Sequence, residues 1–118
     1  MNNMTGKEMA AIATKALEDK KAVDIKVIDI EKISSIADYF IIASGTNINQ
    51  VQAMADNVEE SLGKSGCDAK QIEGYMGGTW ILMDYGDLVV HIFDEENRKF
   101  YDLERIWRDG QLVDYKEL

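Results

Sequence analysis

The segment from Trp80 to Phe93 constrains the fold more than any other part of this chain. It reads WILMDYGDLVVHIF, which is two apolar runs separated by Asp-Tyr-Gly-Asp. Gly86 can adopt the positive φ that a two-residue hairpin loop requires, so a loop of Tyr85 and Gly86 predicts two antiparallel neighbouring strands. In that register three pairs of residues lie opposite each other: Asp84 and Asp87, Leu82 and Val89, and Trp80 and His91.

The two faces of this predicted hairpin differ in chemistry. One face carries only aliphatic and thioether side chains, which suits burial beneath helices: Ile81, Met83, Leu88, Val90 and Ile92. The other face mixes an indole, an imidazole and carboxylates with apolar residues, and we interpret it as the working face. The alternative is that Trp80 is a core residue and His91 a hydrogen-bonded neighbour, and a single sequence leaves both interpretations open.

The rest of the chain predicts further helices and strands around the hairpin. Thr5 and Glu8 match a capping box in front of a first helix, and Asp94 can cap a last helix. The predicted helices are 6–20, 48–66 and 95–107, the last with Phe100, Leu103 and Trp107 facing inward, and the predicted strands are 23–30, 39–43 and 69–72. Residues 1–118 then form a single α/β domain, a mixed β-sheet flanked by helices, with 111–118 as a frayed tail.

Composition excludes several classes of function. The formal net charge is −9, from 22 acidic and 13 basic side chains. Because this charge repels the phosphate backbone of a nucleic acid, a basic protein is a better candidate partner than DNA or RNA. Cys67 is the only cysteine and His91 the only histidine, which excludes an intramolecular disulfide and an ordinary Cys/His zinc site. No secretory signal and no apolar run of membrane-spanning length is present, so we expect a cytoplasmic protein without membrane contact.

Candidate catalytic groups do not form a convincing set in the sequence. Cys67 has nothing local to lower its pKa, and Asp84 with Asp87 lacks a third ligand for a cation. Ser44, at a strand-to-helix junction, suggests an anion site, but the glycine-rich loop and lysine of a P-loop are absent. We therefore expect no enzyme, no cofactor and no metal site. Metal-dependent nucleotidyl transfer around Ser44, Asp84 and Asp87 is the rival hypothesis.

Docking to a basic partner requires only an apolar centre within an acidic rim. The hairpin supplies an apolar centre that consists of Trp80, Leu82, Phe93 and Tyr85. Its acidic rim consists of Asp84, Asp87, Asp94, Glu95 and Glu96. The predicted partner-binding residues are Trp80, Leu82, Asp84, Tyr85, Asp87, Val89, His91, Phe93, Asp94 and Glu95.

Ordered motifs over nearly the whole chain resemble a known family. They are ADYFIIASGT at 37–46, QVQAMAD at 50–56, Glu73-Gly74 before Trp80, DYGDLVVHIF at 84–93 and RKFYDLERIW at 98–107. In this combination and spacing the chain resembles the Iojap family of ribosomal silencing factors, known in bacteria as RsfS. Met83 and Asp94 depart mildly from the family pattern.

This resemblance implies a function that composition could not supply. Such factors bind the large ribosomal subunit through ribosomal protein fourteen, on the face where the subunits meet, and keep the small subunit from joining when nutrients are short. It also implies a fold similar to nucleotidyltransferases, without that chemistry, and self-association as a possible homodimer when free. A dimerisation module without ribosome affinity is a further alternative.

Overall fold

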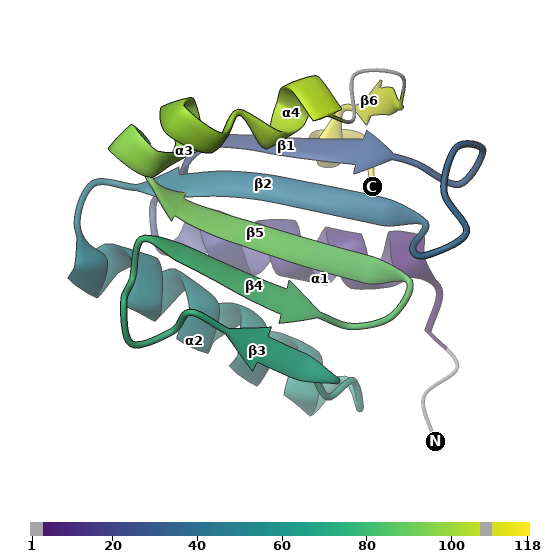
Figure 1. Ribbon diagram of the computed structural model, residues 1–118. Coiled ribbons are helices and arrows are strands. Elements are labelled where there is room, and N and C mark those ends of the chain that lie inside the picture. The colour runs from purple at the N-terminus through teal and green to yellow at the C-terminus, as the bar shows by residue number, and fades with distance from the viewer. Residues whose placement is uncertain (1–3, 107–109) are drawn as a thin grey trace.

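A six-stranded mixed sheet forms the centre of the molecule (Figure 1). The computed structural model describes residues 4–106 and 110–118. The strand order is β3-β4-β5-β2-β1-β6, with β2 and β5 parallel and the other pairs antiparallel, so the predicted mixed sheet is confirmed. The bounds are β1 Val23–Asp29, β2 Tyr39–Gly45, β3 Gln71–Glu73, β4 Trp80–Asp84, β5 Leu88–Asp94 and β6 Gln111–Val113.

Helices cover both faces of this sheet (Figure 1). On one face lie α1 (Gly6–Asp19), which begins with the predicted capping box of Thr5 and Glu8, and α2 (Ile48–Lys64), which Asn47 caps. On the other face lie the short helices α3 (Glu95–Tyr101) and α4 (Leu103–Ile106). Every residue of β2 is buried, because this strand has a neighbour on each side and helices above and below.

The β4–β5 hairpin has the predicted faces but a different register. Trp80 lies opposite Phe93 and Leu82 opposite His91, a shift of two residues from the prediction. The Tyr85 backbone N–H donates to the Leu88 carbonyl (2.8 Å), so the loop is Gly86-Asp87, and Gly86 takes a φ of 87°. A glycine in the first loop position suits a type II′ turn. Because side chains alternate with period two, a shift of two leaves each residue on its predicted face.

The last predicted helix is broken at Asp102. This residue adopts the left-handed conformation (φ 47°) and ends α3, after which α4 begins as a separate helix at Leu103. The helical phase of a single helix over 95–107 is therefore lost, and the inward position predicted for Phe100 is wrong, since its side chain is 79% exposed. Leu103 does pack against the core, and Trp107 lies outside the described residues.

The C-terminal segment is ordered, contrary to the frayed tail predicted for 111–118. Gln111–Val113 pairs with β1 as the edge strand β6, and Tyr115–Glu117 forms a 3₁₀ helix. Val113, Tyr115 and Leu118 pack against the core beneath α1 and α2. Three strand residues are too few for an alternating pattern, so only the free edge of β1 determines their conformation.

Candidate partner-binding surface

Trp80 lies half-buried at the start of β4, among rings from β5 and α3. Its ring centroid is 5.1 Å from that of Phe93 and 4.7 Å from that of Tyr101. Phe93 is fully buried, whereas Tyr101 is exposed. The indole is thus anchored on the core on one side and open to water on the other, an arrangement that combines the two interpretations left open by the sequence.

The chain that precedes β4 adds a carboxylate beside the indole. Glu73 on the edge strand β3 pairs with Leu82, and Glu73, Gly74, Trp80 and Leu82 line one shallow hollow. Gly74 has a φ of 79°, and a Cβ there would lie 2.1 Å from the Trp80 carbonyl oxygen, so only glycine permits this close approach. We call Glu73, Trp80, Leu82 and Tyr101 the Trp80 surface.

His91 lies directly behind this surface and is 4% exposed. Its Nδ1 accepts a hydrogen bond from the Trp80 indole Nε1 at 3.0 Å, and its ring centroid is 4.7 Å from that of Phe40. Burial lowers the pKa of His91 from 6.5 to about 4, because a buried imidazolium would lose its hydration. The imidazole is therefore neutral at physiological pH, with its proton on Nε2, and cannot act as a charge.

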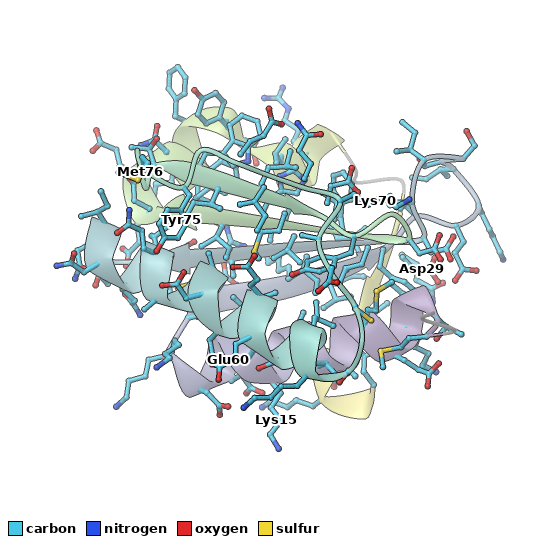
Figure 2. All side chains as sticks on the ribbon, turned by 90° about the horizontal axis from the view of Figure 1, so that it is seen from below. Lys15, Asp29, Glu60, Lys70, Tyr75 and Met76 are labelled. Atoms are coloured by element: carbon cyan, nitrogen blue, oxygen red, sulfur yellow. The ribbon has the colours of Figure 1, made fainter. Side chains whose placement is uncertain are left out.

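The structure separates the predicted acidic rim into two groups. Asp84 ends β4 and Asp87 lies in the loop before β5, whereas Asp94 is the last residue of β5 and Glu95 the first of α3. At about 3.3 Å per residue the two groups lie roughly 20 Å apart along β5. In Figure 2, Lys70, whose side chain lies close to Gly86, and Met76, in the lead-in to β4, lie on opposite sides of the molecule. One continuous ring around Trp80 is therefore excluded.

Two of these four carboxylates also have structural hydrogen bonds. Asp84 Oδ1 accepts from the Gly86 backbone N–H (2.8 Å), and Asp94 Oδ1 accepts from the Asn97 backbone N–H (2.7 Å) as the N-cap of α3. Glu95 is exposed in the first turn of α3, where a negative charge is favoured by the helix dipole.

Four predicted site residues are buried. Val89, His91 and Phe93 lie on the same face as Trp80, and the rings of His91 and Phe93 contact the indole. Val89 lies farther along β5, opposite Asp84. Tyr85 is wrongly placed by the prediction: once the loop is Gly86-Asp87, Tyr85 belongs to the aliphatic face and packs in the core with α1 and α2. That burial raises the pKa of the Tyr85 hydroxyl.

Arg98 fastens α3 to the end of the sheet. Its guanidinium Nη1 donates to Ser44 Oγ (2.8 Å) and to the backbone carbonyls of Val23 and Asp24, and Nη2 lies 3.5 Å from Asp24 Oδ2. Asp24 adopts a φ of 50° where the register of β1 shifts against β2, a bulge that turns these carbonyls toward the guanidinium. Because Tyr101 belongs to α3, this anchor also places Tyr101 beside Trp80. The sequence motif RKFYDLE contains Arg98 and Tyr101, but the contacts of these two residues could not be predicted from the motif.

The groups of the rival catalytic hypothesis do not converge. Ser44 lies at the level of Phe93, whereas Asp84 lies opposite Val89 near the other end of β5. Cys67 packs in the core beside Met4, with the sheet between it and His91. Within the described residues, no three His, Cys, Asp or Glu side chains are grouped closely enough to hold a metal ion. Among the same residues, every helix is too short or too polar to cross a membrane.

The fold and the site define a small α/β domain with a half-buried indole as its most distinctive surface group. The family model described as "Ribosomal silencing factor during starvation" (RsfS) matches residues 3–118. The chain belongs to this ribosomal silencing factor family, as its sequence motifs predicted.

Individual relatives agree in sequence and in fold. Ribosomal silencing factor RsfS of Bacillus subtilis is 41% identical over 94% of each chain. A crystal structure of a protein from Chromobacterium violaceum superimposes with a TM-score of 0.86 at 38% identity, covering 88% of this chain and 87% of that one. The mouse protein named "Mitochondrial assembly of ribosomal large subunit protein 1" is 32% identical over 82% of this chain and 46% of its own length.

Proposed function

We propose that this protein represses translation by binding the large ribosomal subunit through ribosomal protein fourteen and blocking the joining of the small subunit. The observation that carries the proposal is family membership over nearly the whole chain, at 41% identity to a ribosomal silencing factor. The name of the mouse relative, which refers to the large ribosomal subunit, supports the choice of subunit. Repression acts in the cytoplasm, under nutrient limitation.

The Trp80 surface is the proposed contact with the ribosomal protein. A half-buried indole flanked by an exposed tyrosine is a typical anchor of a protein interface, and truncating such a residue costs about 2 kcal/mol or more of binding free energy. His91 and Phe93 contribute from beneath by holding the indole in place, whereas Val89 lies farther along β5. Tyr85 has no part in this contact, because it lies on the opposite face of the sheet.

Carboxylates around this surface fit a basic partner. Glu73 lies beside Trp80, and Asp94 and Glu95 lie where β5 ends and α3 begins. The net charge of −9 attracts a basic protein and accelerates its association, which is the main effect of charges at the rim of an interface. A partner that extends along the whole of β5 also reaches Asp84 and Asp87.

The proposed mechanism is steric, so no bond is made or broken. The Trp80 surface binds the ribosomal protein. The rest of the domain, which measures 33 × 32 × 25 Å as a whole, occupies space that the small subunit needs. The proposal includes a homodimer of the free protein, and a dimer that used the Trp80 surface would exclude ribosome binding.

Sedimentation with isolated large ribosomal subunits tests the proposal. The wild type should co-sediment with them and Trp80→Ala should bind about 30-fold more weakly, which corresponds to about 2 kcal/mol. Ile36→Ala is the matched control, because Ile36 is an exposed apolar residue (79%) in the loop between β1 and β2. Absence of wild-type binding at low salt refutes the proposal, and self-association without binding indicates a dimerisation module instead.

A further inference from the structure

The hydrogen bond from Trp80 to His91 joins the proposed binding surface to the protein interior. Trp80 and His91 are diagonal neighbours on adjacent strands, since Trp80 lies opposite Phe93 and Leu82 opposite His91. The indole Nε1 donates to Nδ1 of an imidazole that is itself buried. The polar edge of the indole is therefore turned inward, and its hydrocarbon part is left for contact with a partner.

The acceptor role defines the state of the imidazole. Nδ1 can accept only when it carries no proton, so the neutral ring is protonated on Nε2. Nε2 is buried and has no hydrogen-bond partner among residues 4–106 and 110–118. A buried N–H of this kind opposes folding unless it is paired, and an aliphatic side chain at this position would avoid the cost. Stability of the core alone therefore does not account for a histidine here.

Packing surrounds the imidazole but leaves the indole freedom on its outer side. The His91 ring contacts Phe40 on the neighbouring strand β2, with 4.7 Å between centroids, and cannot move without disturbing the core. Trp80 is half-buried at the first residue of its strand, and the χ2 torsion of tryptophan has a broad energy profile. The hydrogen bond to His91 is thus the polar contact that selects one orientation of the ring.

We propose that His91 is a positioning residue for partner binding, whose Nδ1 holds the Trp80 indole in the orientation that the ribosomal protein recognises. A side chain that is ordered before binding does not lose that freedom on binding, so preorganisation increases affinity. This inference rests on the proposed function, because it concerns the affinity of the Trp80 surface for its partner.

Two amide substitutions test the proposal with a matched pair of side chains. In His91→Asn the amide oxygen can occupy nearly the position of Nδ1, whereas in His91→Gln the amide lies near the position of Nε2. His91→Asn should retain wild-type affinity for isolated large subunits, and His91→Gln should lose roughly fivefold, the fold-change that one ordinary hydrogen bond represents. His91→Leu should lose as much as His91→Gln.

A double-mutant cycle separates positioning from a general effect on the fold. In a Trp80→Phe background there is no indole N–H, so His91→Gln should cause no further loss of affinity. The exchange of the Trp80 indole proton with water, observed by NMR and assigned with Trp80→Phe, should be slow in the wild type and in His91→Asn and fast in His91→Gln.

The outcomes distinguish this proposal from the proposed function. Suppose that the wild type binds large subunits. The positioning role is then refuted, while the function stands, if His91→Gln binds as tightly as the wild type. It is also refuted if His91→Gln causes the same loss of affinity in the Trp80→Phe background as in the wild-type background. If the wild type does not bind, the proposed function fails, and with it a role of His91 in binding the ribosome. The exchange rates would then report the hydrogen bond alone.

Discussion

Acidification should destabilise this protein through one buried side chain, His91. Its pKa in the folded state is about 4, against 6.5 in the unfolded chain, because burial disfavours the imidazolium. The unfolded state therefore binds a proton at a higher pH than the folded state does. The stability associated with the neutral ring is complete above pH 6.5 and is lost as the pH falls toward 4. Linkage gives a loss of about 2 kcal/mol between pH 8 and pH 5.

Urea unfolding at these two pH values, followed by circular dichroism, measures this effect. The carboxylates also respond to pH, so the relevant quantity is the difference between the wild type and His91→Asn, in which all the other titratable groups are the same. The wild type should lose about 2 kcal/mol more than the variant between pH 8 and pH 5. Equal losses in the two proteins would show that burial does not depress the pKa of His91, and the argument would be wrong.

Three further predictions follow from particular contacts. Arg98→Ala should lower the free energy of unfolding by about 2–4 kcal/mol, measured in urea, because the buried Ser44 hydroxyl and the part-buried Asp24 carbonyl lose their donor. Gly86→Ala should destabilise by about 1 kcal/mol or more because of its φ of 87°, whereas Gly63→Ala, in α2 with open space around it, should be neutral or stabilising. Glu95→Lys should lower the rate of association with large subunits and reduce the salt dependence of that rate, as measured by stopped-flow kinetics at two salt concentrations. The control, Glu60→Lys on α2, should change the rate and its salt dependence less.

The face of each hairpin residue was predictable although the register was not. Ile81, Met83 and Val90 lie in the core beneath the sheet, as the alternating pattern indicated. Tyr85 was predicted as a loop residue of the docking centre, but the loop lies one residue later, and Tyr85 packs in the core on the other face of the sheet. Alternation is a local property that depends on each strand alone, whereas the loop position depends on which residue best adopts a positive φ.

The composition of the proposed binding surface was only partly predictable. Trp80 and Leu82 were identified from the hairpin, but Glu73 and Tyr101 were not. Glu73 reaches the surface through strand pairing between β3 and β4, and Tyr101 reaches it because α3 folds back over the sheet. These contacts join residues that are not neighbours in any local pattern.

By itself the amino-acid sequence determined the elements with strong local signals: the capping box of α1, the two faces of the hairpin, the buried strand β2, and the motifs that indicate the family. Only the tertiary structure decided which ends of the strands meet. The parallel pairing of β2 with β5 places Ser44 far from Asp84 and divides the acidic residues into two groups. Periodicity and capping act over a few neighbouring residues, whereas strand order depends on the burial of the whole sheet between its helices, which no short segment encodes.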